Sequence, residues 1–158
     1  MIQRIQSIFL LIVGLTMFGM LFMKTWQIQL ADKTMTIITP LYSLDKSEGA
    51  EAVITYFPYS FVGIIVFLSS LVAIVAIFQY KNRLSQIKLG ALNALLISAS
   101  LVISMFLVYN AQKPFAPENY GSYGIGIYFP VIGLIFNLLS NRFIRRDEKL
   151  VQSVDRLR

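Results

Sequence analysis

The sequence predicts an all-α membrane protein, a bundle of four transmembrane helices, and three observations support that fold class. Hydrophobic residues make up 56% of the 158 residues and charged residues only 14%, whereas about a quarter of a soluble domain is charged. The charges are also segregated, which leaves four uncharged stretches. Each stretch is long enough to cross a bilayer, because a helix rises about 1.5 Å per residue and the hydrocarbon layer is about 30 Å thick.

The four uncharged stretches set the predicted spans. Allowing for turn-forming residues at their ends, the helices are predicted at about 5–23, 57–80, 89–111 and 125–141. Open strands are excluded within these stretches, because lipid offers no partner for unpaired backbone groups. The stretches also lack the alternation of a transmembrane barrel strand. Residues 1–158 are therefore predicted to form a single integral membrane domain.

The first span has the alternative interpretation of a secretory signal, since Arg4 precedes an apolar stretch. However, the stretch is longer than a typical signal core, and Lys24-Thr25-Trp26-Gln27 after it is a poor peptidase site. We therefore expect an uncleaved membrane anchor.

Orientation follows from the distribution of positive charges. The N-terminus, the loop 81–88 and the tail 142–158 carry ten of the fourteen Lys and Arg residues, with a net charge of +7. The loops 24–56 and 112–124 carry the other four, with a net charge of −1. Both termini are therefore expected on the cytoplasmic side of the membrane.

The two outer loops differ in pattern. Alternation of polar and apolar residues over 26–30 and 34–38 predicts a small β-hairpin, followed by a polar loop over 43–49. The second outer loop is rich in proline and glycine, which predicts irregular structure before the last helix.

The tail 142–158 is amphipathic and basic, so it either prolongs the last helix or lies along the cytoplasmic leaflet. Its predicted cytoplasmic basic face consists of Arg142, Arg145, Arg146, Lys149, Arg156 and Arg158. Each such residue attracts anionic lipid by about 1 kcal/mol near the surface, so membrane lipids are expected partners. No nucleic acid is expected, because the positive-inside rule already explains these charges and no stacking aromatics are interleaved.

Aromatic residues gather on the predicted outer side, where seven of the eight tyrosines lie. Rings with a polar tip settle at headgroup level, so an interfacial belt is the simplest interpretation. The asymmetry between the two sides leaves a second interpretation, an outer ligand or protein contact. This predicted outer aromatic cluster comprises Trp26, Tyr56, Tyr59, Tyr120, Tyr123 and Tyr128.

The predicted spans contain no Asp, Glu, Lys or Arg, and the chain has no His or Cys. Proton relays, pumps and charge-driven transporters use ionisable groups at membrane depth. We therefore predict no catalytic, cofactor-binding or metal-binding residue, no cofactor, and no enzymatic activity. The acidic group Asp45, Glu48 and Glu51 is interpreted as a solvated loop rather than a cation site.

Small residues recur at four-residue spacing in the third span, where they let helix backbones approach closely. Gly90, Ala94 and Ser98 form one stripe, and Ser100 and Ser104 repeat the spacing on another face. The first stripe is predicted to pack inside the bundle. For the second, packing inside the bundle and packing against another protein remain equal alternatives.

Both ends of the chain resemble the Bacteroidota family of short four-span inner-membrane proteins of unknown function. The opening 1–6, Met-Ile-Gln-Arg-Ile-Gln, and the closing segments 141–151 and 155–158 carry the resemblance. It implies an integral protein of the Gram-negative cytoplasmic membrane and supplies no catalytic residue or cofactor.

Two functional hypotheses follow. The first is a non-catalytic accessory or structural subunit of a larger inner-membrane complex for secretion, translocation or envelope assembly, with a membrane-protein partner. The second is a small carrier or lipid-handling protein whose site is the outer aromatic cluster. A membrane enzyme is the least favoured class.

Overall fold

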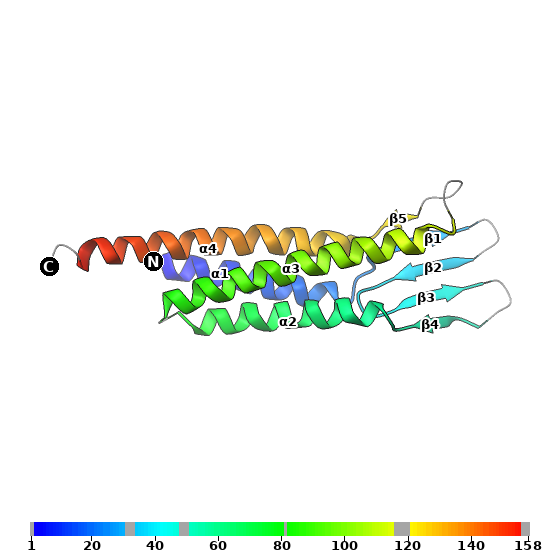
Figure 1. Ribbon diagram of the computed structural model, residues 1–158, viewed down its shortest axis with the longest axis horizontal. Coiled ribbons are helices and arrows are strands. Elements are labelled where there is room, and N and C mark those ends of the chain that lie inside the picture. The colour runs from blue at the N-terminus through cyan, green and yellow to red at the C-terminus, as the bar shows by residue number, and fades with distance from the viewer. Residues whose placement is uncertain (1, 31–33, 48–50, 81, 116–120, 156–158) are drawn as a thin grey trace.

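The computed structural model describes residues 2–30, 34–47, 51–80, 82–115 and 121–155, with side chains described from residue 5 to residue 151 within those ranges. Four α-helices run side by side along the long axis of the molecule (Figure 1). They are α1 (Ile2–Met20), α2 (Tyr59–Phe78), α3 (Arg83–Gln112) and α4 (Tyr128–Asp155). Helix α1 packs against α2 and α4, and α3 packs against the same two helices, which closes the group.

The helix ends follow from local chemistry. Asn82 precedes α3, and its Oδ1 accepts a hydrogen bond from the backbone N–H of Ser85 at 3.1 Å, which satisfies a donor that the first turn leaves free. Pro130 lies in the first turn of α4, where the missing N–H costs no helical bond. The tail does prolong this helix, since α4 continues to Asp155.

Within the described residues, three helical segments are long and apolar enough to cross a membrane, namely Tyr59–Phe78, Arg83–Gln112 and Ile125–Val151. The remaining apolar helical segment, Ile5–Met20 in α1, is shorter. The prediction of long apolar helices is therefore confirmed for three of the four spans. A complete crossing by α1 stays a prediction.

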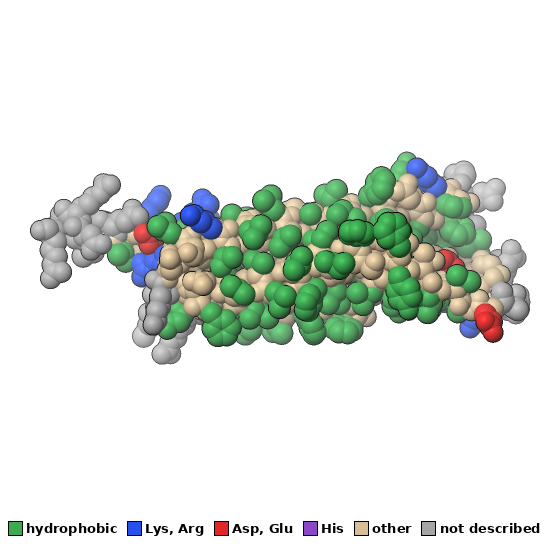
Figure 2. Space-filling model, turned by 60° about the horizontal axis from the view of Figure 1, so that its bottom comes forward, with side chains coloured by type: hydrophobic (Ala, Val, Ile, Leu, Met, Phe, Trp, Pro, Cys, Tyr) green, Lys and Arg blue, Asp and Glu red, His purple; other side chains and the backbone are tan. Residues whose placement is uncertain are grey.

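The helix group buries several polar side chains and exposes large apolar ones. Ser69, Asn93 and Asn137 are fully buried between the helices, whereas Leu95 and Val102 are 69% and 66% exposed. Figure 2 shows a middle belt whose visible face carries apolar side chains and no Lys, Arg, Asp or Glu, with charged side chains at both ends. The interior also contains a hydrophobic cluster that includes Val13, Val66 and Ile97. An apolar exterior that encloses buried polar side chains suits a protein surrounded by lipid.

A five-stranded antiparallel sheet lies at one end of the helices. The predicted all-α class with a small hairpin therefore underestimated the β-structure of the protein. The strand order is β4-β3-β2-β1-β5. The strands are β1 (Trp26–Gln29), β2 (Met35–Ile38), β3 (Ser43–Lys46), β4 (Val53–Thr55) and β5 (Ser122–Tyr123). The predicted hairpin is present as β1 and β2, with Trp26 opposite Ile38.

Two predictions about the loops were wrong. The predicted polar loop 43–49 contains β3, because the turn after β2 returns the chain as a strand. In that turn, the Thr39 N–H donates to the Tyr42 carbonyl at 2.9 Å, and the Tyr42 N–H donates to Thr39 Oγ1 at 3.1 Å. The predicted irregular second loop contributes β5, in which Tyr123 pairs with Trp26.

Helix α3 joins the helix group to the sheet. At 30 residues it is about 45 Å long, which exceeds the hydrocarbon thickness of about 30 Å. Toward its C-terminal end, the buried Val108 packs with Trp26, Ile28 and Ile38 of the sheet. The N-terminal end of α1, the α2–α3 connection and the C-terminal end of α4 lie at the opposite end of the molecule (Figure 1).

Candidate functional site

The helix interior contains hydrogen-bonded polar side chains. The Ser69 hydroxyl on α2 donates to Asn93 Oδ1 on α3 at 2.7 Å, and both residues are buried. The Asn137 Nδ2 on α4 donates to the Gly90 carbonyl on α3 at 2.8 Å. These bonds specify which helix faces meet, since apolar packing against lipid-like neighbours gives little preference by itself.

The first small-residue stripe lies toward the α3–α4 contact at Gly90. A methyl group on Gly90 would overlap the Asn141 amide of α4, so only glycine allows this approach. Gly90 is buried, and Ala94 and Ser98 farther along α3 are half-buried.

The second small-residue face is also buried within this chain. Ser100 and Ser104 are 0% and 5% exposed, and the Ser100 hydroxyl donates to the Ile97 carbonyl at 2.8 Å. This face is therefore covered by the chain itself and offers no surface to a separate protein.

Sequence reasoning missed a group of amides toward the end opposite the sheet. The Gln86 Nε2 donates to the Ala76 carbonyl at 3.1 Å, and the Ser140 hydroxyl donates to the Gln6 carbonyl at 3.4 Å. Asn137 and Asn141 share one face of α4, and that four-residue spacing was the available signal.

Several interior amide atoms have no hydrogen-bond partner among the described residues: Gln6 Nε2, Asn93 Nδ2, Asn137 Oδ1 and Asn141 Oδ1. Side-chain amides do not ionise near neutral pH, so these groups can orient a neutral polar molecule and are unsuited to act as acid or base. In the same described residues no group of three acidic side chains is placed to hold a metal ion, and Glu48 lies outside them.

The predicted outer aromatic residues do not form one site. Trp26 is fully buried under the sheet, and Tyr59 is half-buried with a side-chain hydrogen bond to Ser43. Tyr56 is exposed beyond β4, with its ring 6.4 Å from that of Tyr42. Because β4 and β1 are separated by two strands, Tyr56 and Trp26 lie far apart.

Two other predicted members of that cluster are described, in β5 and at the start of α4. Tyr123 in β5 pairs with Trp26, and Tyr128 begins α4; both side chains are exposed. Tyr120 lies outside the described residues. Sequence reasoning missed Gly121, which lies so close to the Trp26 ring that an added methyl group would overlap it.

Strand β4 is an exposed edge of the sheet. All three strand residues are exposed, with Val53 at 60% and Ile54 at 47%, and Tyr56 and Phe57 continue the exposed apolar surface. Among the described residues β4 pairs only with β3, so the other side of its backbone has no neighbouring strand there. We call Val53, Ile54, Thr55, Tyr56 and Phe57 the β4 edge.

An apolar hollow of about 330 Å³ lies between α1, α2 and the turn after β2. The described residues that line it are Leu21, Leu41, Ser60, Gly63, Ile64, Phe67 and Leu68. Because nearly all of these lining side chains are apolar, the hollow can accept a hydrocarbon chain.

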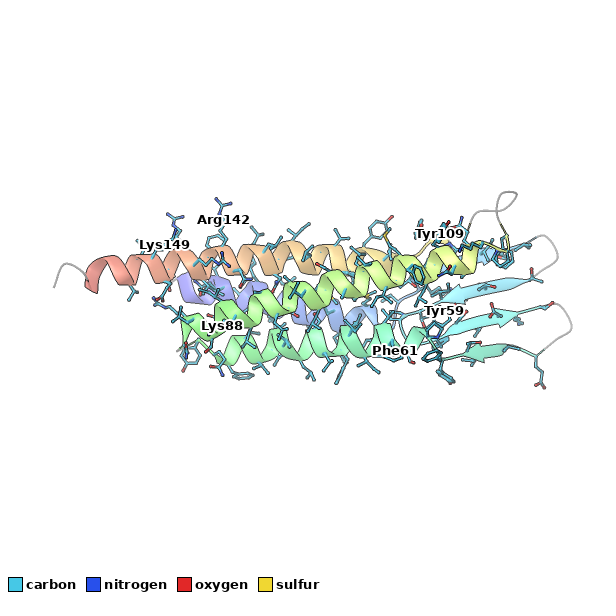
Figure 3. All side chains as sticks on the ribbon, in the orientation of Figure 1. Tyr59, Phe61, Lys88, Tyr109, Arg142 and Lys149 are labelled. Carbon is cyan, nitrogen blue, oxygen red and sulfur yellow. The ribbon has the colours of Figure 1, made fainter. Side chains whose placement is uncertain are left out.

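The described members of the predicted basic face lie together on α4. Arg142, Arg145, Arg146 and Lys149 are all exposed and line a hollow of about 490 Å³. Figure 3 shows Arg142 and Lys149 directed away from the other helices on the same side of α4. The predicted members Arg156 and Arg158 lie outside the described residues. We call the four described residues the basic stripe.

Comparison with curated proteins finds no match. Residues 2–157 match the family described as Domain of unknown function (DUF4293). Because this match covers nearly the whole sequence, the chain belongs to the DUF4293 family.

Proposed function

We propose that the protein is a non-catalytic accessory subunit of a larger complex in the cytoplasmic membrane, and that it binds its partner through the β4 edge. In this proposal all four helices span the bilayer, as in the four-span Bacteroidota proteins that the chain resembles. Both termini lie in the cytoplasm, and the sheet lies on the outer surface. The open β4 edge is the observation that carries the proposal.

An open sheet edge favours a specific kind of partner. Its unpaired backbone N–H and C=O groups can pair with an extended segment, which adds a strand to the sheet. Soluble proteins block such edges with lysine, proline or bulges. Val53, Ile54 and Thr55 include none of the blocking residue types, and the apolar Tyr56 and Phe57 beside them are exposed. The occupant we propose is an extended strand of a second membrane-complex protein.

Blocking the β4 edge is expected to disrupt the complex. We predict that the double variant V53K/T55K recovers about ten-fold less partner, equivalent to about 1.4 kcal/mol. The measurement is photo-crosslinking from a benzoylphenylalanine at Ile54 in intact cells, followed by gentle extraction and mass spectrometry. Both positions are exposed, so the fold should tolerate the change.

The control adds a lysine to the sheet away from the edge. Gln29 is exposed on β1, which β2 and β3 separate from β4, so Q29K should leave crosslinking unchanged. If the chain that carries benzoylphenylalanine at Ile54 and no lysine substitution yields only uncrosslinked monomer, the proposal is contradicted. Crosslinking only to a second copy of the chain would replace the partner with a homodimer.

The proposed orientation predicts opposite labelling of two engineered cysteines, since the chain has no cysteine of its own. A cysteine at the exposed Ser47, after β3, should react with a membrane-impermeant maleimide in spheroplasts. A cysteine at the exposed Lys88, near the start of α3, should react only after permeabilisation. Labelling of both positions from the same side would exclude the proposed topology.

The apolar hollow favours a second candidate function, a lipid-handling protein. A hollow of about 330 Å³ lined by Leu21, Gly63 and Phe67 can accept part of an acyl chain. Copurification of a lipid whose recovery falls in the variant G63L would favour this alternative. Retention of the same lipid by G63L would exclude it.

A further inference from the structure

We propose that the basic stripe binds the phosphate-bearing headgroup of an anionic phospholipid, in the leaflet at the end of the molecule opposite the sheet. The site is distinct from the β4 edge and does not depend on a protein partner. It rests on the proposed membrane insertion, which the cysteine labelling checks separately.

The spacing of the basic stripe concentrates positive charge on one face of α4. Arg142, Arg145, Arg146 and Lys149 follow the i, i+3, i+4, i+7 pattern, which places them on one side of a helix. The stripe is about 10 Å long at 1.5 Å per residue. The hollow of about 490 Å³ that these residues line gives an anionic headgroup a place to lie.

The two acids of α4 whose side chains are described, Asp147 and Glu148, contact a different neighbour. Asp147 Oδ2 lies 3.2 Å from Arg83 Nη2 of α3, and Glu148 Oε2 lies 4.0 Å from Arg83 Nη1. The Arg83 Nη1 also donates to the Asp147 carbonyl at 3.4 Å. Among the described residues, no stripe residue forms an ion pair, so four positive charges remain uncompensated on the exposed face.

Arginine makes phosphate the favoured anionic group. Its planar guanidinium can donate two parallel hydrogen bonds to phosphate oxygens, which a single ammonium group cannot do. Three of the four stripe residues are arginines.

The same face of α4 distinguishes a lipid from free phosphate. Val131, Ile135 and Leu138 are 41%, 53% and 55% exposed, and they precede the basic stripe along one side of the helix. An exposed apolar face that leads into a cationic stripe matches the acyl chains and headgroup of one phospholipid. Free phosphate would use only the cationic part.

The stripe also lies at headgroup depth. Tyr128, at the start of α4, is exposed at the sheet end of the helix. Arg142 and Lys149 lie about 21 Å and about 31 Å farther along the axis, near the far boundary of a hydrocarbon layer of about 30 Å. Arginine and lysine at such positions extend their charged groups to the lipid phosphates.

The test measures lipid binding to the full-length purified protein by native mass spectrometry. Phosphatidylglycerol and phosphatidylcholine are titrated in parallel at low ionic strength. The wild type is expected to bind phosphatidylglycerol more tightly. The variant R142Q/R145Q/R146Q/K149Q is expected to bind phosphatidylglycerol at least about ten-fold more weakly than the wild type, with little change in its affinity for phosphatidylcholine. Inorganic phosphate added in excess should not displace the lipid, whereas full displacement would assign a free-phosphate site instead.

The matched control removes the same number of charges elsewhere. K24Q/K46Q/K88Q/K113Q alters four exposed lysines outside the stripe and should retain phosphatidylglycerol. Equal losses in both quadruple variants, or none in the stripe variant, would overturn the proposal. If the stripe variant fails to insert, R145Q/R146Q carries the test with an expected loss of about three-fold, and unchanged affinity there overturns the proposal.

Discussion

Replacement of Gly90 by valine is expected to force α3 away from α4 and to lower the free energy of unfolding by about 1–3 kcal/mol or more. A side chain at this position would overlap the Asn141 amide. The displacement would also break the 2.8 Å bond from Asn137 Nδ2 to the Gly90 carbonyl. Valine is a better helix former than glycine, so the loss reports packing and not helix propensity. Equilibrium unfolding in mixed detergent micelles measures the change.

The control for Gly90 is its neighbour on the same helix. Ala91 is exposed on the surface of α3, so A91V should change the free energy of unfolding by less than about 0.5 kcal/mol. Equal stability of G90V and A91V would show that α3 and α4 do not approach closely at this point.

Replacement of Trp26 by alanine is expected to destabilise the sheet by about 3–5 kcal/mol. Trp26 is fully buried and packs with Ile28, Ile38 and Val108. Loss of its ring would leave a cavity between the sheet and the end of α3. The measurement is thermal unfolding in detergent, monitored by the circular dichroism of the strands.

A variant that retains the tryptophan tests the same contact spectroscopically. Trp26 is the sole tryptophan of the chain, so fluorescence reports its environment directly. G121V should shift the emission to longer wavelength, because the new side chain would displace the ring toward water. The exposed neighbour Ser122 provides the control S122V, which should leave the spectrum unchanged. An unshifted G121V spectrum would contradict the packing of Gly121 on Trp26.

The helices were predictable because their signal is local. Uncharged stretches bounded by charged residues have a length that can be compared directly with the bilayer. The end of α4 was less certain, because the tail sequence suits either a continued helix or a surface segment. Its Phe143 and Leu150 are compatible with both arrangements.

Most of the sheet could not be predicted because its signal is not local. Strand β3 reads Ser-Leu-Asp-Lys, a polar sequence that is held by backbone pairing to β2 and β4. Strand β5 is two residues long and pairs with β1, which lies about 95 positions earlier. Neither hydrophobic periodicity nor turn chemistry specifies a partner at that distance.

The two predicted surfaces, the basic face and the aromatic cluster, differ in the same respect: the first is local in the sequence and the second is not. The basic stripe was visible because its spacing within one helix is a sequence property. The aromatic cluster failed as a single site because strand order decides which rings meet, and β2 and β3 separate Trp26 from Tyr56. The hydrogen bond between Ser69 and Asn93 joins α2 and α3. It could not be predicted, because the sequence does not determine how one helix is rotated about its axis relative to the other.

The continuity of α3 has a mechanical consequence. The helix runs without a break from Arg83 to Gln112, with Val108 under the sheet and Arg83 paired to Asp147 of α4 at the other end (Figure 1). One unbroken helix therefore joins the contact with Trp26 to the ion pair between Arg83 and Asp147. A displacement of the sheet is expected to be transmitted along this helix to its contact with α4, which links the two ends of the molecule.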